Sequence, residues 1–533
     1  MLGLGLAPTG AAAETTSTIR PVRQCAELVK GFDIPGAATH VTAASVVSAS
    51  ASEPAHCDVR GYVEPAVQFQ LRLPTATFAG RYLQYGCGGF CGVISPAPFP
   101  DCGGPHGGDL AVAVTNDGHV AALPAVDGAW ANNQVARNDW FYRAPHVLSR
   151  AAKQIIAAYY GASPTHSYFS SCSNGGREAL LLAQRYPNDF DGIIAGAPAH
   201  YLGPLFGVYQ TWLARTNTAA NGAPIITSAK LPALHNAVVA ACDGLDGLVD
   251  GQIDDPRDCR FDPVTLQCPT GTDQPSCLTP AQVDAARTLY TGPIDAHGRR
   301  LYPGGQPRGS ELAWASYNWI VPPPEGGRST AELLADIYLK YVGYPLGTPH
   351  SSVADFEFTV GEFDRLRPEG VKGNAMSLHL DKFRRSGGKL IIWHGWDDQA
   401  IPATGTLDYY QRLWQRSGGL RETQEWARVF MIPTMAHCAG GYRLTEFEPL
   451  RELVSWVERG TAPDRIIATA RDAQGNVLRS RPVFPYPLRA KYDGTGSIDD
   501  ASNFVPAPPV LAPHDTIRWV GTDLYAKPGP VTP

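Results

Sequence analysis

The segment from residue 166 to residue 198 restricts the fold of this chain more than any other part of the sequence. Residues 166–171 predict a strand, 175–186 predict a helix, and 193–198 predict a second strand that ends in a turn at Pro198. A strand, a helix and a strand in this order predict a parallel sheet with crossover helices, because parallel neighbours can only be joined by a long crossover.

The same alternation continues on both sides of this segment. Further apolar runs predict strands, and two segments show the spacing of apolar residues that is typical of an amphipathic helix. The predicted strands cover 67–73, 81–85, 110–115, 389–394 and 426–433, and the predicted helices cover 145–160 and 449–459. The fold class that these elements indicate is α/β.

A long segment interrupts this pattern. Between 204 and 385 the chain is rich in glycine, proline and tryptophan and has few long apolar runs. The 533 residues also exceed what one hydrophobic core usually supports. We therefore expect a sheet-containing catalytic domain formed by 14–203 and 386–533, with 204–385 inserted as a lid domain.

A candidate nucleophile lies where the predicted strand over 166–171 meets the predicted helix. The sequence there is Ser171-Cys172-Ser173-Asn174-Gly175. A nucleophile elbow needs small residues two positions before and two positions after its serine, because the tight turn brings their backbones together. Ser173 meets this requirement and is the candidate nucleophile, and the alternative is an ordinary serine at a strand–helix turn.

A serine hydroxyl is a weak nucleophile at neutral pH, so it needs a base that an acid orients. In hydrolases with this order of elements, the acid and then the histidine follow the serine along the chain. Asp397 and Asp398 follow one predicted strand, and His437 follows the next. His437 is the candidate base, and the two aspartates are alternative acids. We interpret His394, at the end of a strand, as a packing or loop-bracing residue.

The negative oxygen that forms during acyl transfer needs two N–H donors. One comes from the residue after the nucleophile, and the other comes from an early glycine-rich loop. Asn174 is the first candidate donor. The loop over 86–92 supplies the second, where Gly88 and Gly89 are alternatives and Gly89 is favoured.

Charge and hydropathy exclude several classes of partner. The net charge is −6 without a long basic run, so we expect no nucleic-acid partner. No apolar stretch approaches the roughly 20 residues of a membrane span, so we expect no membrane insertion. Residues 1–13 resemble the end of a signal peptide, and eleven cysteines without a C-x-x-C pair are typical of disulfides in an exported chain. These features predict a secreted protein.

Several of these motifs resemble those of one known family. Cys172-Ser173 before Gly175-Gly176, a downstream aspartate, and His437-Cys438 are similar to the tannase and feruloyl esterase family. Its members are α/β-hydrolase serine esterases and include a terephthalate monoester hydrolase. The resemblance extends over nearly the whole chain, with further matches at Arg177-Glu178, 191–198 and 387–391.

The resemblance implies two features of the site. It selects Asp398 rather than Asp397 as the acid, although Gln399 stands where the family usually has proline. It also implies a disulfide between Cys172 and Cys438. Such a link would hold the loop of the nucleophile against the loop of the base, and small misplacements of reacting groups are costly.

We expect the other cysteines to form pairs as well. The expected pairs are Cys25–Cys57, Cys242–Cys259, Cys268–Cys277 and, in the glycine-rich loop, Cys91–Cys102. The last pair would leave Cys87 free, and a Cys87–Cys91 pair is the alternative.

The predicted lid contains three closely spaced aspartates, Asp243, Asp246 and Asp250, and each of them is directly followed by a glycine. Hard oxygen ligands in a glycine-rich loop suit Ca²⁺. The family resemblance implies a structural calcium ion, and the alternative is a solvated acidic turn. The implied ligands are the side chains of Asp243, Asp246 and Asp250 and the carbonyls of Leu248 and Gln252.

Together these features predict two-step acyl transfer by a serine esterase. The resemblance implies a small aromatic ester as the substrate, carried on plant polysaccharide in the case of a feruloyl ester, which is favoured. Galloyl esters and terephthalate monoesters are alternatives, and an inactive hydrolase fold that serves as a binding module is the alternative of another class. The candidates for an aromatic pocket in the lid are Trp314, Tyr317, Trp319, Phe356 and Phe358.

Overall fold

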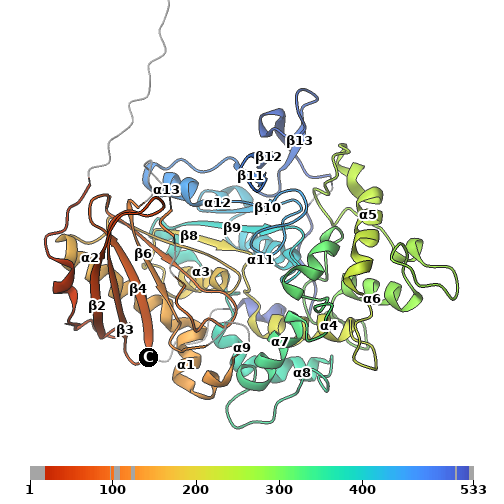
Figure 1. Ribbon diagram of the computed structural model, residues 1–533, viewed down its shortest axis with the longest axis horizontal. Coiled ribbons are helices and arrows are strands. Elements are labelled where there is room, and N and C mark those ends of the chain that lie inside the picture. Colours follow the sequence, from red (N-terminus) through yellow and green to blue (C-terminus); the bar gives the residue numbers. More distant parts are fainter. Residues whose placement is uncertain (1–17, 96–97, 101–107, 122–126, 511–512, 527–533) are drawn as a thin grey trace, which may run out of the picture.

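The computed structural model of the chain describes residues 18–95, 98–100, 108–121, 127–510 and 513–526 (Figure 1). The expected signal segment over 1–13 and Cys102 lie outside the described residues. None of the helices in the described ranges has both the length and the apolar character that crossing a bilayer requires.

A ten-stranded sheet runs through the molecule in the order β1-β2-β3-β4-β6-β5-β7-β8-β9-β10 (Figure 1). The strands from β6 to β10 in this order are all parallel, whereas β1 to β4 pair antiparallel and β4 pairs antiparallel with β6. The strands are β1 (Gly31–Phe32), β2 (Thr39–Val47), β3 (His56–Val63), β4 (Val67–Pro74), β5 (Arg81–Tyr85), β6 (Leu110–Thr115), β7 (His166–Cys172), β8 (Gly192–Gly196), β9 (Lys389–Gly395) and β10 (Ala427–Ile432).

The predicted parallel sheet is confirmed, and the predicted strands correspond to β4 to β10. The strands β1 to β3 were not predicted. In β2 the second half is mostly exposed and contains small and polar residues, so it lacks the alternation of apolar and polar side chains that marks a half-buried strand.

Helices pack on both faces of the sheet. Neighbouring residues of one strand belong to different cores, because successive side chains of a strand point to opposite faces. Phe169 and Ile193 share a core with the helices α2, α3 and α11, whereas Tyr168 and Ile194 pack with α13 on the other face. These helices are α2 (Ala144–Tyr160), α3 (Asn174–Arg185), α11 (Ala403–Arg416) and α13 (Leu450–Arg459).

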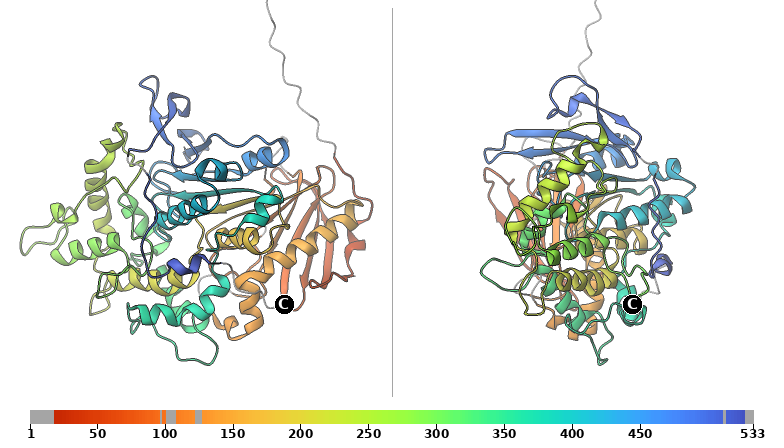
Figure 2. Two further views of the ribbon diagram at one scale, coloured as in Figure 1. Left: turned by 180° about the vertical axis from the view of Figure 1, so that it is seen from behind. Right: turned by 90° about the vertical axis from the view of Figure 1, so that its right-hand side faces the viewer.

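Residues 197–388 leave the sheet after β8 and return at β9 without adding a strand to it. They form helices and loops that gather beside the sheet, in yellow and green in Figures 1 and 2. The helices of this insertion are α4 (Gln210–Thr216), α5 (Leu231–Cys242), α6 (Pro280–Thr291), α7 (Thr330–Ile337), α8 (Val360–Arg365), α9 (Arg367–Gly373) and α10 (Asp381–Arg385).

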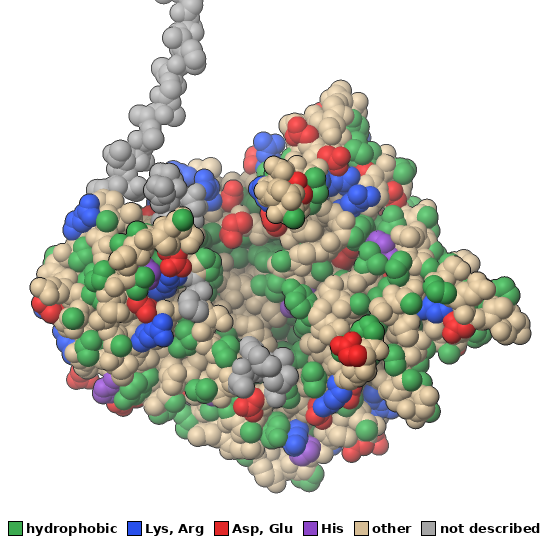
Figure 3. Space-filling view, in the orientation of Figure 1, with side chains coloured by type: hydrophobic (Ala, Val, Ile, Leu, Met, Phe, Trp, Pro, Cys, Tyr) green, Lys and Arg blue, Asp and Glu red, His purple; other side chains and the backbone are tan. Residues whose placement is uncertain are grey.

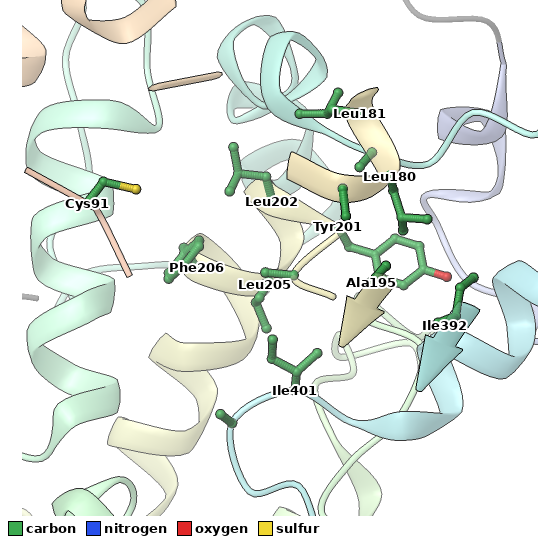
Figure 4. Packing of buried hydrophobic residues seen from close by; sticks show 14 of the residues in the cluster. Cys91, Leu180, Leu181, Ala195, Tyr201, Leu202, Leu205, Phe206, Ile392 and Ile401 are labelled. Carbon is green, nitrogen blue, oxygen red and sulfur yellow. The ribbon is translucent and has the colours of Figure 1, made fainter. Parts of the chain in front are cut away.

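The beginning of the insertion packs directly on the core of the sheet (Figure 4). Leu202 and Leu205 lie beside Leu180 of α3 and Ala195 of β8, and all four side chains are buried. The insertion is therefore continuous with the hydrophobic core at its first turn.

The rest of the chain consists of short elements. Two two-stranded sheets near the carboxyl end, drawn in blue at the top of Figure 1, were not predicted. They are β11 (Ile466–Arg471) with β12 (Val477–Val483) and β13 (Arg489–Tyr492) with β14 (Phe504–Ala507), and the remaining helices are α1 (Gln134–Asn138) and α12 (Leu420–Gln424).

Candidate active site

Ser173 occupies a sharp turn between β7 and α3. Its φ of 65° and ψ of −124° are unusual for a residue with a side chain. The two glycines that follow Ser173 at a distance of two and three residues leave no room for a side chain. A Cβ on Gly175 would lie 2.0 Å from Oγ of Ser171, and a Cβ on Gly176 would lie 2.3 Å from the carbonyl oxygen of Gly196. The local geometry is that of a nucleophile elbow.

Three side chains form a hydrogen-bonded row at the carboxyl ends of β7, β9 and β10. Nε2 of His437 lies 2.9 Å from Oγ of Ser173, and Nδ1 of His437 lies 2.7 Å from Oδ2 of Asp398. The Ser173 hydroxyl can donate to His437, and the His437 Nδ1–H can donate to Asp398. The predicted serine, histidine and aspartate therefore meet in one site.

Asp398 is fully buried and keeps its charge through its contacts. Oδ1 accepts the backbone N–H groups of Ala400 and Ile401, each at 2.8 Å. Burial alone would raise the pKa of Asp398, but the charge and hydrogen bonds of His437 and His394 hold that pKa well below its ordinary value. A buried carboxylate with a low pKa can hold a histidine in a fixed tautomer over a wide pH range.

His394 is buried next to the acid rather than next to the serine. Its Nε2 lies 3.1 Å from Oδ2 of Asp398 and 2.9 Å from the carbonyl oxygen of Ile401, while Nδ1 lies 2.8 Å from Oγ1 of Thr406. These contacts brace the loop that carries Asp398, in keeping with the interpretation from sequence. Its direct contact with Asp398 was not foreseen.

The neighbouring Asp397 has no hydrogen bond to His437 among the described contacts. It is buried, its Oδ2 has no described partner, and its backbone N–H donates to the carbonyl oxygen of Met435 at 3.0 Å. Burial, and then the negative charge of Glu311, raise the pKa of Asp397 well above its ordinary value. The structure thus separates the two aspartates into one that contacts the histidine and one whose pKa is raised by burial.

The glycine-rich loop over 86–92 lies beside the elbow. Gly89 has a φ of 57°, and Nε2 of His119 lies 2.8 Å from the carbonyl oxygen of Phe90. The expected Cys91–Cys102 pair is wrong, because Cys91 is bonded to Cys87, whose Cα lies 5.4 Å away across the tight turn of the loop. A turn of four residues brings these two side chains together more readily than a partner elsewhere in the chain.

A buried carboxyl pair lies behind Asn174. The side-chain amide of Asn174 donates to Oε1 of Glu178 at 2.8 Å, and Nε of Arg177 donates to Oδ1 of Asn174 at 2.8 Å. Burial and then the charge of Glu178 raise the pKa of Asp117 well above its ordinary value, and burial raises the pKa of Glu178 to about 7. We infer that Asp117 is protonated and shares its proton with Glu178.

Asn174 links this pair to the glycine-rich loop of the predicted oxyanion site. The side-chain amide of Asn174, which donates to Glu178, also donates to the carbonyl oxygen of Cys87 in the glycine-rich loop at 3.4 Å. Arg177 and Glu178 were part of the family resemblance, but the sequence analysis assigned them no function. Their apolar helical neighbours gave no signal that two charged side chains are buried beneath the elbow.

The disulfide between Cys172 and Cys438 joins the residue before Ser173 to the residue after His437. Its cysteines are 266 residues apart, and their Cα atoms are 5.9 Å apart. The other disulfides among the described residues, besides Cys87–Cys91, are Cys25–Cys57, Cys242–Cys259 and Cys268–Cys277. The Cys172–Cys438 disulfide therefore joins the two loops of the site covalently.

One of the five aromatic candidates lies at the site. The ring of Trp319 is 5.5 Å from the ring of His437, and its Nε1–H donates to Oε1 of Gln210 at 3.0 Å. Trp314 and Phe356 are buried in the core, whereas Tyr317 is 77% exposed. In the view of Figure 3, the face between the sheet and the insertion is hollowed and hydrophobic side chains line the hollow. Of these aromatic candidates, Trp319 is the one whose ring lies against His437.

The predicted calcium loop folds around Asp243. The carboxylate of Asp243 accepts the backbone N–H groups of Asp250, Gly251 and Gln252 at 2.9–3.2 Å. Asp246 accepts the backbone N–H of Leu248 at 2.9 Å. The carboxylates of Asp243 and Asp246 thus already accept backbone hydrogen bonds that shape the loop.

A smaller set of oxygens remains free for a cation. Asp246, Asp250 and Asp254 line one small cavity with Leu248, and the basic side chains Arg481, Arg489 and Lys491 line it as well. Oδ2 of Asp250 accepts from Arg481 at 2.5 Å, but its Oδ1 is buried without a described partner. Carboxylate and carbonyl oxygens around an unsatisfied oxygen fit Ca²⁺ by donor chemistry. Asp254 was not among the predicted ligands.

Comparisons with known proteins agree with one another. The sequence model of the family described as "Tannase and feruloyl esterase" matches residues 51–507. The chain is 33% identical over 555 residues to mono(2-hydroxyethyl) terephthalate hydrolase of Piscinibacter sakaiensis, covering 89% of each protein. It is 30% identical over 451 residues to a probable feruloyl esterase B-1 of Aspergillus fumigatus, covering 80% of each. The solved structure of feruloyl esterase B from Aspergillus oryzae matches with a TM-score of 0.75 at 26% identity, over 89% of this chain and 98% of that one.

Replacing both Cys172 and Cys438 by alanine tests the covalent link. We expect a loss of stability of about 2–5 kcal/mol in denaturant unfolding, because the link closes a long loop. The rate at which a fluorophosphonate labels Ser173 should fall about a hundredfold, because the serine and its base lose their fixed spacing. The same replacement at Cys268 and Cys277, nine residues apart in the insertion, is the control and should leave the labelling rate unchanged. Equal labelling of both variants would contradict the positional role.

Replacing Asp117 by asparagine tests the shared proton. The folded-state pKa of Asp117 is raised above its ordinary value of 3.8, so wild-type stability falls as the pH rises from 3.8 toward that raised pKa. An asparagine amide can donate to Glu178 without losing a proton, so the melting temperature of Asp117→Asn should gain on wild type as the pH rises. Asp262→Asn, at an exposed aspartate whose pKa is lowered by Arg287, should show the opposite sign. Parallel curves for Asp117→Asn and wild type would overturn the pairing.

Proposed function

The chain belongs to the tannase and feruloyl esterase family, and from that premise we propose that Ser173, His437 and Asp398 are its catalytic triad. The chain is a carboxylic ester hydrolase, as the family and the relatives indicate. The single observation that supports the triad most strongly is the row of hydrogen bonds from Ser173 through His437 to Asp398, at 2.9 and 2.7 Å.

In the proposed reaction, His437 Nε2 accepts the proton of the Ser173 hydroxyl while Oγ attacks the ester carbonyl carbon. The carbonyl oxygen becomes an oxyanion, and the alcohol leaves when His437 returns the proton to it. Water then attacks the acyl-enzyme in the same manner, with His437 again as base, and releases the carboxylic acid. Asp398 remains ionised throughout and stabilises the imidazolium that forms.

The backbone N–H groups of Asn174 and Gly89 are the proposed donors to the oxyanion. Asn174 is the first residue of α3, so its N–H has no partner within the helix and lies at the positive end of the helix dipole. Gly89 lies on the loop that the Cys87–Cys91 disulfide closes. Two donors fixed before substrate binds stabilise charge that develops only in the transition state.

The proposed substrate is an ester of a hydroxycinnamic acid, of which a feruloyl ester is the first choice. Both a curated relative and a solved structure that match over most of this chain carry the name feruloyl esterase. Trp319 beside His437 offers an aromatic surface for the ring of the acid. The 33% identical relative is named for a terephthalate monoester, which is also an aromatic acid, so that ester is the second candidate.

We further propose that the protein is secreted and that its insertion holds a structural Ca²⁺. Five disulfides among the described residues are typical of an oxidising compartment. The proposed ligands are the side chains of Asp246, Asp250 and Asp254 and the carbonyl oxygen of Leu248. The side chain of Asp243 and the carbonyl oxygen of Gln252, which the sequence analysis predicted, are proposed as ligands as well. The ion would neutralise the clustered carboxylates and brace the loop that Cys242–Cys259 closes.

The assignment of the acid is tested by two matched variants. Asp398→Asn should lower kcat by a factor on the order of 10³–10⁴, because an amide leaves His437 in the wrong tautomer. Asp397→Asn should change kcat little, because burial raises the pKa of Asp397 and an amide resembles a protonated carboxyl. Ser173→Ala sets the background rate. A large loss of kcat in Asp397→Asn together with a small loss in Asp398→Asn would reverse the assignment.

The substrate is tested by comparing kcat/KM for methyl ferulate, methyl gallate and mono(2-hydroxyethyl) terephthalate. We expect methyl ferulate to be the best of the three, and Trp319→Ala to raise its KM because the aromatic contact is lost. A clear preference for the gallate or the terephthalate ester would replace feruloyl ester as the substrate. Turnover of none of them by a protein whose Ser173 is labelled by a fluorophosphonate would overturn the aromatic-ester proposal.

The calcium site is tested by thermal unfolding. Chelator should lower the melting temperature and added Ca²⁺ should restore it, because an ion that binds only the folded chain stabilises it, by about 2.7 kcal/mol at a hundred times Kd. Asp246→Asn should lose most of this response, whereas Asp262→Asn, at an exposed aspartate outside the loop, should retain it. Identical melting with and without chelator in the wild type would exclude a structural ion.

A further inference from the structure

A cavity of about 320 Å³ lies beside the loop that joins β9 to α11, and none of Ser173, Asp398 and His437 lines it. Its described lining contains four arginines and two aromatic side chains but no acidic side chain. These residues are Arg257, Arg260, Arg300, Arg308, Tyr290 and Trp396. Four cations around one cavity stand out in a chain whose net charge is −6.

Only one of the four arginines is neutralised. Arg257 forms ion pairs with Asp255 and Asp515. Within the described ranges, Arg260, Arg300 and Arg308 form no ion pair with any carboxylate. Asp258 interacts electrostatically with Arg260, and Asp262 interacts with Arg308, but neither carboxylate forms an ion pair with these arginines or lines the cavity. The guanidinium groups therefore leave a net positive potential in the cavity, and such a potential raises the local concentration of anions.

The unpaired arginines keep free donors toward the cavity. Arg308 uses its Nε–H on the carbonyl oxygen of Phe261 at 2.8 Å, so both of its Nη groups remain available. Arg300 uses one Nη on the carbonyl oxygen of Thr291 at 3.0 Å. The Arg308 guanidinium also lies 4.7 Å from the ring centroid of Tyr290, and this stacking limits its motion without occupying its N–H groups.

The cavity is separated from the triad by two glutamines. Gln306 lines the cavity and donates its Nε2–H to the carbonyl oxygen of Gln399 at 2.8 Å. The side-chain Oε1 of Gln399 accepts the backbone N–H of His437 at 3.2 Å. A ligand in the cavity would therefore be separated from His437 by Gln306 and Gln399.

We propose that this cavity is a binding site for an acidic oligosaccharide, with Arg260, Arg300 and Arg308 as the ligands of its carboxylates. Guanidinium groups bind carboxylates by paired hydrogen bonds. One small acid would occupy one arginine, whereas three unpaired arginines around an open cavity match a chain that carries several carboxylates, such as a run of uronate residues. The choice of a polysaccharide rests on the proposed feruloyl esterase function together with the expectation from the sequence analysis that a feruloyl ester is carried on plant polysaccharide.

The test measures binding without catalysis. A Ser173→Ala protein is titrated by calorimetry with tetragalacturonate, with a neutral tetrasaccharide of galactose, with inorganic phosphate and with ferulate. We expect tetragalacturonate to bind, to bind more weakly at high salt, and to exceed the other three. Arg300→Gln and Arg308→Gln should each weaken it about tenfold, the effect of losing one charge-assisted hydrogen bond of about 1.4 kcal/mol.

The matched control is Arg421→Gln, which removes an arginine whose side chain is 90% exposed on α12, away from the cavity lining. It should leave the affinity unchanged, and the melting temperatures of all variants identify any that fail to fold. If phosphate binds as tightly as tetragalacturonate, the cavity is a site for any small anion. If the neutral sugar binds equally well, or if the arginine variants bind tetragalacturonate as tightly as the parent protein, the arginines do not recognise the ligand. Each of these results overturns the proposal, and none of them bears on ester hydrolysis, which is measured separately with small esters.

Discussion

Parallel pairing of β7, β8, β9 and β10 determines where the reacting side chains meet. Parallel strands end at the same edge of a sheet, so the loops after β7, β9 and β10 emerge side by side although they are separated by more than 200 positions in the case of Ser173 and His437. The tight contact of Gly176 with Gly196 holds α3 against β8 and sets the direction of the turn. A side chain at Gly176 would push the elbow away from the edge at which the base arrives.

Buried carboxyl groups near this edge are controlled in three different ways. Asp398 is surrounded by N–H donors from Ala400, Ile401 and two histidines, which compensate for the loss of water and keep it charged. Asp397 receives no such donors to its Oδ2 among the described contacts, and burial raises its pKa well above the ordinary value. Asp117 and Glu178 divide one charge between two carboxyls. Buried carboxyl groups near one edge thus behave differently because the hydrogen-bond donors and the charges around them differ.

The sequence predicted the parallel part of the sheet and the three triad positions well, since both depend on local patterns: apolar runs, a small-residue turn, and polar residues at strand ends. Contacts that depend on three-dimensional packing were harder to predict. The pairing of Cys91 was assigned to Cys102, because spacing along the chain does not show which cysteines a turn brings together. The edge strands β1 to β3, the link from His394 to Asp398 and the carboxyl pair at Asp117 and Glu178 carry no local signature. Their partners lie in other elements, which only the folded chain reveals.

The Cys172–Cys438 disulfide has a consequence for how the protein is made. The chain is synthesised from its amino end at roughly 5–20 residues per second, so Cys172 waits on the order of tens of seconds before its partner, 266 residues later, exists. During that interval the nucleophile has no base, and Cys172 is a free thiol among five earlier cysteines, Cys25, Cys57, Cys87, Cys91 and Cys102. The site is therefore completed last, after the insertion has been made. Correct maturation depends on a compartment that can both form disulfides and exchange wrong ones.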